Sequence, residues 1–179
     1  MVLKQKISKM LPGQSLHSDT FRKMLIKHLW RGYFVTCSKI HICYPLIINV
    51  KLKCIENFHQ YFFNLPPDND YIKWTVGKAM YMADGTALKQ KQALDENGFY
   101  SDIISSSAVC TIICDSIQFD EHTRKFSYYG TQIIKRRTRD LKRTMLTTGY
   151  VENVPRTQNN PHGLMITNWR TLENKDLDY

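Results

Sequence analysis

The sequence lacks the motifs of the common catalytic and nucleotide-binding families. It contains no GxSxG nucleophile elbow, no GxxxxGK[ST] phosphate loop, no GxGxxG dinucleotide fingerprint and no HExxH zinc motif. Asp115, Asp120 and Glu121 are close in sequence, but two of them fall in a predicted turn, where acidic residues are common for local reasons. We therefore expect that the chain is not an enzyme, has no catalytic residues and binds no cofactor.

The cysteine pattern excludes a disulfide framework. There are 5 cysteines, an odd number, and no CxxC pair. Four of them lie in apolar, strand-like runs, where free cysteine behaves as a small hydrophobic residue. Cys37, His41 and Cys43 can share one strand face, but they lack a fourth ligand at a usual zinc spacing. The pattern predicts reduced thiols, a reducing compartment and no metal site.

Long apolar runs are also absent. The longest uncharged one, IHICYPLIINV, is far short of the roughly 20 residues that span a bilayer, and it contains a proline. The beginning of the chain, MVLKQKISKMLPG, is too short and too charged for a secretory signal. We expect a soluble or peripheral protein.

What the sequence does have is unevenly placed positive charge. The net charge is +9 over 179 residues, and the basic residues concentrate in residues 1–31 and 135–143. Such clusters indicate an acidic partner, either nucleic acid or an anionic membrane, or else serve solubility alone. The length predicts a single domain with a sizeable core. We expect a basic flexible arm over residues 1–17, one α+β domain over 18–170 and a loose tail over 171–179.

The first 11 residues suit a short amphipathic helix in a membrane interface. Apolar residues recur at helical spacing and lysines flank them, as in interfacial helices that reach lipid headgroups. The alternative is a frayed basic terminus, because so short a helix is unstable alone in water. The candidate membrane-binding residues are Leu3, Lys4, Lys6, Ile7, Lys9, Met10 and Leu11.

Periodicity predicts the elements that follow. A capped helix is expected over residues 19–32, and strict alternation in LIINVKLKCI predicts that residues 33–55 are extended. Helical spacing then predicts one helix that Pro66-Pro67 ends and another from Ile72 to Ala83. Residues 86–100 are ambiguous, since TALKQKQAL suits a helix and DENGFY suits an exposed loop.

The clearest pattern is a β-hairpin over residues 108–134. Two strand-like runs, AVCTIICDSIQF and KFSYYGTQII, flank a five-residue break, DEHTR, which is a usual hairpin length. Two short strands are expected near the end of the chain, at residues 150–154 and 164–169, with a long turn between them.

Between these hairpins lies the strongest basic cluster, KRRTRDLKR. Thr138 can cap a helix that ends at Gly149 and turns Leu141 and Met145 inward. The basic side chains then form either a solvated helix face or a phosphate-binding face. The candidate nucleic-acid-binding or nucleocapsid-binding residues are Lys135, Arg136, Arg137, Arg139, Lys142 and Arg143.

This order of elements resembles the matrix proteins of rhabdoviruses, and the small basic versions of plant cytorhabdoviruses are the most similar. The resemblance covers residues 33–169. It rests on a strand ending in VKLKC, helices at IENFHQYFF and DYIKWTVGKAMYM, a strand pair, a helix at DLKRTMLTTG and a terminal hairpin from YVENV to GLMITNW. It implies a single compact α+β domain, an antiparallel β-sheet packed against helices, with a basic N-terminal arm.

The resemblance also implies a function. Such a matrix protein self-associates into a homo-oligomer, condenses the nucleocapsid of RNA and nucleoprotein, and links it to the anionic inner membrane face during assembly and budding. A viral glycoprotein tail is a further expected partner. The expected locations are the virion, the host cytoplasm and the host membrane surface, with nuclear entry through 135–143. Many animal-virus members of that family carry a budding motif, PPxY. It is missing here, because Pro66-Pro67 is followed by Asp68-Asn69 and not by a tyrosine at the fourth position.

A second interpretation is a non-specific RNA-binding viral accessory protein, such as a silencing suppressor or movement factor. It would need aromatic side chains on a strand to stack on bases, and Tyr128 and Tyr129 are the candidates. The lysine-flanked N-terminus favours the matrix protein instead.

Overall fold

The computed structural model describes residues 34–177, with side chains from residue 48 onward. The chain divides into two units, Met1–Leu46 and Ile47–Tyr179, and the fold described below is that of the second unit. The described elements, in chain order, are α3 (Phe34–Phe63), α4 (Asn69–Met80), α5 (Gly85–Glu96), α6 (Phe99–Ser105), β1 (Val109–Phe119), β2 (Lys125–Lys135), β3 (Leu141–Asn153) and β4 (Leu164–Asp176).

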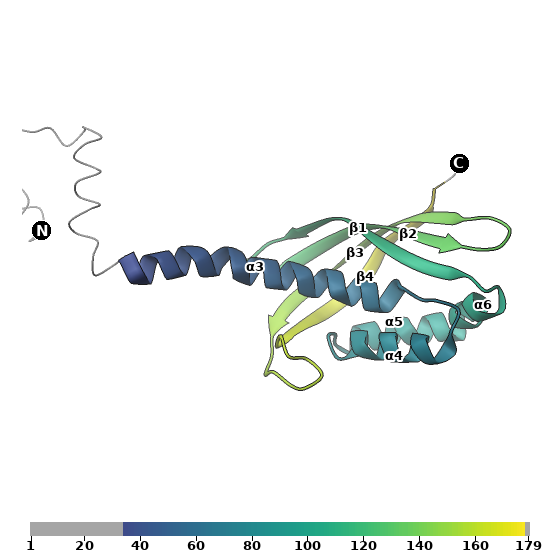
Figure 1. Cartoon of the computed structure of the whole chain (residues 1–179), viewed down its shortest axis with the longest axis horizontal. Coiled ribbons are helices and arrows are strands. Elements are labelled where there is room, and N and C mark those ends of the chain that lie inside the picture. Colours follow the sequence, from purple (N-terminus) through teal and green to yellow (C-terminus); the bar gives the residue numbers. More distant parts are fainter. Residues whose placement is uncertain (1–33, 178–179) are drawn as a thin grey trace, which may run out of the picture. The chain divides into compact units, whose positions relative to one another are not determined.

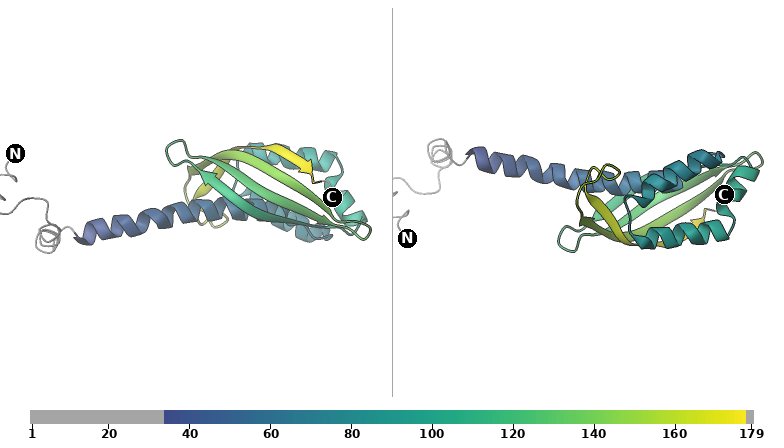
Figure 2. Two further views of the ribbon diagram at one scale, coloured as in Figure 1. Left: turned by 90° about the horizontal axis from the view of Figure 1, so that it is seen from above. Right: turned by 90° about the horizontal axis from the view of Figure 1, so that it is seen from below.

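The four strands form one antiparallel sheet in the order β1-β2-β3-β4. Helices cover one of its faces: the strands lie in front in the view from above, and the helices lie in front in the view from below (Figure 2). Along β2 the buried positions alternate strictly with half-buried ones, as the two-residue period of a strand requires. The predicted α+β fold, an antiparallel sheet packed on helices in a single domain, is confirmed (Figure 1).

The core forms where the C-terminal half of α3 lies against the sheet. Phe58 and Phe62 recur four residues apart on one face of α3 and are almost fully buried. Both rings meet Trp169 of β4 edge-on, with centroids 5.0 and 4.9 Å away. A second buried cluster, built around Leu65 and Tyr100, joins the end of α3 to α4, α6 and β1.

His59 is the one histidine among the core residues of the described chain, and it is fully buried. Its Nδ1 lies 2.7 Å from the carbonyl oxygen of Ile55, and its Nε2 lies 2.7 Å from the hydroxyl of Thr147. Because a carbonyl only accepts, Nδ1 donates, and Nε2 must then accept from Thr147. The imidazole is also stacked on Tyr128 at 3.7 Å. His59 thereby ties α3 to β2 and β3.

The predicted extended region over residues 33–55 is wrong, because those residues from Phe34 onward belong to α3. The alternation in LIINVKLKCI is coincidental. Among the residues whose side chains are described, burial follows a helical period only from Cys54, and Val50 is 44% exposed. The helix predicted before Pro66-Pro67 is correct, but it begins far earlier than its apolar spacing indicated.

The predicted helix after Thr138 is also wrong, because β3 runs from Leu141 to Asn153. A spacing of four residues, as between Leu141 and Met145, puts both side chains on one face of a strand as well as of a helix. Ten backbone pairs with β2 favour the strand. The predicted hairpin over residues 108–134 is confirmed, with its turn between Phe119 and Lys125.

Three further predictions have mixed outcomes. The helix predicted from Ile72 to Ala83 is present as α4, but it ends at Met80 and Ala83 pairs with Ile166 instead. TALKQKQAL is helical, within α5, whereas DENGFY is not an exposed loop throughout, since α6 begins at Phe99 and Tyr100 is buried. The terminal strands pair as expected, but β4 continues through Asp176 into the predicted tail. The helix over residues 19–32 lies outside the described residues.

Candidate binding pocket

Helix α4 presents aromatic side chains to solvent. Asp68 caps the helix by accepting a hydrogen bond of 2.8 Å from the backbone N–H of Tyr71. Ile72, Val76 and Ala79 turn inward. The opposite side carries Tyr71, Trp74 and Tyr81, which are 46%, 54% and 53% exposed. Large exposed rings gathered on one helix are typical of interaction surfaces.

Lys78 lies between two of the rings that border this surface. Its Nζ is 3.7 Å from the ring centroid of Trp74 and 5.7 Å from that of Tyr61 on α3. The negative faces of aromatic rings attract an ammonium group at such distances. Within the described chain Lys78 forms no ion pair with a carboxylate. Its positive charge is therefore held in place without being neutralised.

The loop between β3 and β4 closes the other side of the pocket. Asn160 is buried, and its side-chain amide donates to the carbonyl oxygens of Tyr81 at 3.3 Å and Leu164 at 2.8 Å. Gly163 has a φ of +63°, and a Cβ there would lie 2.7 Å from the carbonyl oxygen of Val154. Glycine is thus required at this turn, and Asn160 fastens the loop to the end of α4.

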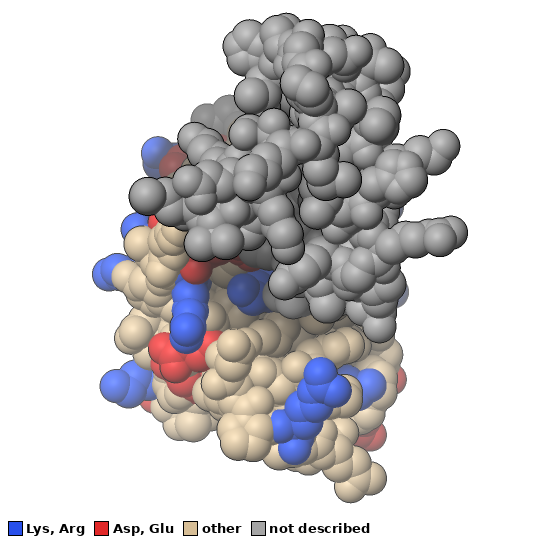
Figure 3. Space-filling view, turned by 90° about the vertical axis from the view of Figure 1, so that its left-hand side faces the viewer, with Lys and Arg blue, Asp and Glu red and all other residues tan. Residues whose placement is uncertain are grey.

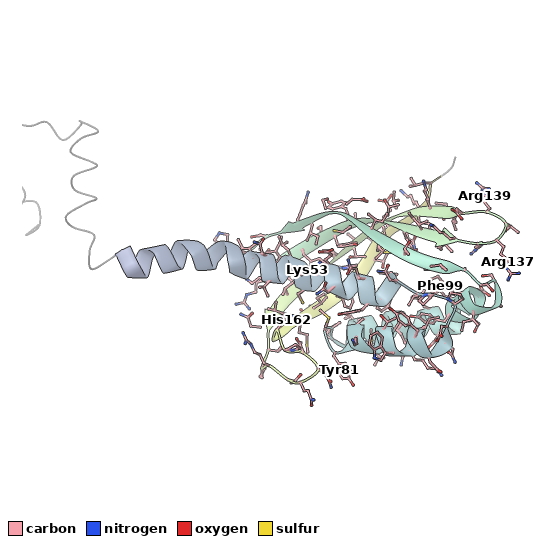
Figure 4. The ribbon with its side chains drawn as sticks, viewed as in Figure 1. Lys53, Tyr81, Phe99, Arg137, Arg139 and His162 are labelled. Atoms are coloured by element: carbon pink, nitrogen blue, oxygen red, sulfur yellow. The ribbon has the colours of Figure 1, made fainter. Side chains whose placement is uncertain are left out.

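These elements enclose a pocket of about 580 Å³, a usual size for a ligand site. It is bordered by α3, α4 and the β3–β4 loop, and Figure 4 labels Tyr81 and His162 on the same side of the fold. The lining residues are Asn57, Tyr61, Lys73, Trp74, Gly77, Lys78, Tyr81, Met82, Gln158, Asn159, Asn160, Pro161 and His162.

The lining combines three kinds of group: exposed rings, side-chain amides and cations. None of its residues is acidic, and none is serine, threonine or cysteine. The pocket therefore favours an anionic ligand. Its lining also contains no carboxylate, serine or threonine that could pair with His162. Among the described residues no group of His, Cys, Asp and Glu is placed to hold a metal ion.

The six basic residues predicted as a nucleic-acid site lie elsewhere. Lys135 ends β2, Lys142 and Arg143 begin β3, and the three remaining arginines occupy the loop between the strands. The structure thus brings all six together, on a hairpin rather than a helix. Figure 4 labels Arg137 and Arg139 at the end of the sheet away from Tyr81 and His162. Whether this basic hairpin binds anything stays a prediction.

Part of the charge on the described surface is paired or interspersed with charge of the opposite sign. Arg143 donates a hydrogen bond to Asp176 of β4, so part of the positive charge of the hairpin is paired. On the face in Figure 3, basic and acidic side chains lie interspersed on a mostly uncharged surface where the structure describes it.

The predicted membrane-binding residues, Leu3 to Leu11, lie outside the described residues. Where the structure describes the chain, it contains no helix with the length and apolar character needed to span a membrane.

Sequence reasoning missed the pocket. It assigned no site to the aromatic residues of α4, and it placed the residues between 154 and 164 only in a long turn. One available signal was the spacing of Tyr71, Trp74, Lys78 and Tyr81, which places them away from Ile72 and Val76 on a helix. The approach of the β3–β4 loop to α4 depends on contacts distant in sequence and had no local signal.

No protein-family model and no curated protein matches the chain. Solved structures do share its fold. The VirB8 protein of Agrobacterium tumefaciens superposes with a TM-score of 0.60 at 11% identity, covering 73% of this chain and 94% of that one. TraE, solved in complex with 2-(2-furyl)isonicotinic acid, superposes with a TM-score of 0.60 at 12% identity, covering 71% of this chain and 96% of TraE. The soluble domain of TrwG, from the type IV secretion machinery of Bartonella grahamii, gives 0.56 at 17%, covering 70% and 93%. The chain has a VirB8-like fold.

These likenesses overturn the viral interpretation. The resemblance to rhabdovirus matrix proteins is wrong, because the solved structures that share the fold include type IV secretion proteins of Bartonella, Legionella and Helicobacter. That resemblance rested on the order of elements, and two of those elements, the strand ending in VKLKC and the helix at DLKRTMLTTG, have the opposite secondary structure.

The predictions that depended on the viral resemblance are wrong with it. They are the functions of viral matrix protein in assembly and budding and of RNA-binding accessory protein; the partners nucleocapsid, viral glycoprotein tail and anionic membrane surface; and the locations virion, host cytoplasm, host membrane surface and nucleus. Self-association is compatible with the new comparison and stays a prediction.

Proposed function

We propose that this chain is a structural component of a bacterial type IV secretion machinery, and that residues 47–177 are its VirB8-like assembly domain. One observation carries the proposal: the fold matches over more than nine tenths of the VirB8, TraE and TrwG chains. A match of that extent includes every layer of the domain rather than one motif. Because fold alone does not fix function, the proposal needs a direct test.

The domain acts by binding rather than by catalysis. The pocket beside α4 supports this, because its lining supplies rings, amides and cations but no carboxylate, thiol or serine to pair with His162. An exposed aromatic surface next to a pocket suits protein docking, where tryptophan and tyrosine are enriched.

The test is genetic and biochemical. Deleting the gene in its bacterial host should abolish secretion through the machinery, and the intact chain supplied in trans should restore it. A variant with Val76→Asp, which puts a carboxylate into the second core cluster, should fail to restore secretion. Unchanged secretion in the deletion strain would contradict the proposal.

A further inference from the structure

The pocket beside α4 is a built site whose occupant can be inferred from its chemistry. It differs from the basic hairpin, whose loop arginines are exposed, because side chains from several elements line it. Three separate elements converge on the pocket, and the hydrogen bond from Asn160 to the carbonyl oxygen of Tyr81 fixes the β3–β4 loop to the end of α4. The identity of the occupant rests on the proposed function as an assembly domain, which implies protein partners.

The first requirement concerns charge. Lys73 and Lys78 both line the pocket, and neither pairs with a carboxylate in the described chain. Nothing acidic in the lining offsets them. An occupant that brings a carboxylate would therefore gain from the field of these groups, and a cationic one would be repelled.

The second requirement concerns shape. Trp74 and Tyr81 are each more than half exposed, and they offer flat apolar surfaces. Lys78 sits close over the ring of Trp74, so a carboxylate next to a planar group can meet the ammonium and a ring together. The amides of Asn57, Gln158 and Asn159 supply donors and acceptors for a peptide backbone.

The third observation is free space at Gly77. This glycine lines the pocket from the middle of α4, and a Cβ built on it would meet no atom within 4 Å. A side chain at this position therefore has room and would occupy the space that a ligand needs. Gly85, the first residue of α5, also has open space around its Cβ but does not line the pocket.

We propose that this pocket binds an acidic peptide segment of a partner protein, one in which an aspartate or glutamate stands next to an aromatic residue. The carboxylate lies by Lys78 and Lys73, and the ring packs on Trp74 or Tyr81.

The test uses the full chain and blocked dipeptides as probes, with the indole N–H signal of Trp74 followed by NMR. N-acetyl-aspartyl-tryptophan amide should bind saturably. The lysyl-tryptophan analogue should bind at least tenfold more weakly, and the aspartyl-alanine analogue at least fivefold more weakly. Lys78→Gln should weaken the aspartyl-tryptophan probe at least fivefold.

The glycine pair provides the matched control. Gly77→Leu should abolish binding of the aspartyl-tryptophan probe without changing the midpoint of thermal unfolding. Gly85→Leu should leave binding unchanged. Equal binding of the lysyl and aspartyl probes, or full binding by Gly77→Leu, would overturn the inference. Binding of phenylacetate as tight as that of the aspartyl-tryptophan probe would also overturn it, because the peptide backbone would then contribute nothing. If the probes fail while the deletion still abolishes secretion, the pocket assignment fails and the proposed function stands.

Discussion

His59 shows how one residue can make the stability of this domain sensitive to pH. The ring is enclosed by aromatic side chains, stacked on Tyr128 and hydrogen-bonded at both nitrogens. Burial lowers the pKa of His59 from 6.5 to about 3, and the hydrogen bond to Ile55 opposes that shift only in part. A proton on Nε2 would remove its ability to accept from Thr147. The folded state therefore holds the neutral ring.

The direction of the pH effect follows from the two states. In the unfolded chain His59 binds a proton near pH 6.5, and in the folded chain it does so only near pH 3. The stability that the neutral His59 ring contributes to the fold is therefore fully present above pH 6.5 and is lost as the pH falls toward 3. Between pH 6.5 and 5 we expect the free energy of unfolding to fall by up to about 1.4 kcal/mol per pH unit. Urea titrations across that range measure the slope.

A matched control separates His59 from the other histidines. His162 is exposed in the β3–β4 loop, so His162→Gln should leave the slope unchanged. A free energy of unfolding that does not vary between pH 6.5 and 5 would mean that His59 is not held neutral in the core.

Asn160 is a second single residue on which the stability of the domain is expected to depend. Asn160→Ala removes the donors to the carbonyl oxygens of Tyr81 and Leu164, and it leaves those oxygens without this partner. We expect a loss of about 1–3 kcal/mol in the free energy of unfolding, measured in urea. Asn159→Ala, at the exposed neighbouring position, should change it by less than about 0.5 kcal/mol. Equal effects of the two substitutions would refute the role of Asn160.

Between elements, the junction of α3 with β1 depends on few polar contacts. Leu65 and Cys110 exchange two backbone hydrogen bonds of 2.9 Å, and the side-chain oxygen of Asn64 accepts from the N–H of Ile112 at 2.7 Å. Asn64→Ala should therefore lower the free energy of unfolding by about 1 kcal/mol and speed hydrogen exchange of the Ile112 amide. Asn64→Asp keeps an oxygen acceptor, so it should lower the free energy of unfolding by less and leave the Ile112 amide protected from exchange. Unaltered exchange at Ile112 in Asn64→Ala would contradict this account.

The elements differ in how far the sequence could predict them. The β1–β2 hairpin was predictable because its apolar residues alternate around a polar break of five residues. Helix α4 was predictable because Ile72, Val76 and Ala79 recur at a helical period. The segment LIINVKLKCI was not, because its apolar residues fall at alternate positions as in a strand, although the segment belongs to α3.

The pocket was less predictable than the fold. Helical spacing could have placed Trp74 and Tyr81 on the exposed side of α4, but no local pattern brings residues 158–162 beside them. That proximity results from the isolated bridge between Ala83 and Ile166 and from the hydrogen bonds of Asn160. Such contacts join residues about 80 positions apart. Periodicity within one element carries no information on contacts of that kind.

At the scale of the whole molecule, the fold is shared with structures only 11–17% identical to it. Burial patterns and strand pairing are sufficient to specify this architecture, so most individual residues can differ. This explains why a resemblance based on charge, length and element order pointed to an unrelated family. Those properties are common to many small basic domains, whereas the pairing order β1-β2-β3-β4 on a helical layer is not visible in composition.

The division of the chain into two units leads to the last prediction. Both described core clusters draw only on residues from Cys54 to Trp169, so residues 47–177 contain every side chain that they use. We expect a fragment of residues 47–177 to fold alone, with a cooperative urea transition at the same midpoint as the full chain. A fragment of residues 60–177 lacks Phe58 and His59, which pack against Trp169 and Tyr128, and it should not fold. Circular dichroism during the titration distinguishes the two fragments. If residues 47–177 gave no cooperative transition, the second unit would depend on the first, and the domain boundary at Ile47 would be wrong.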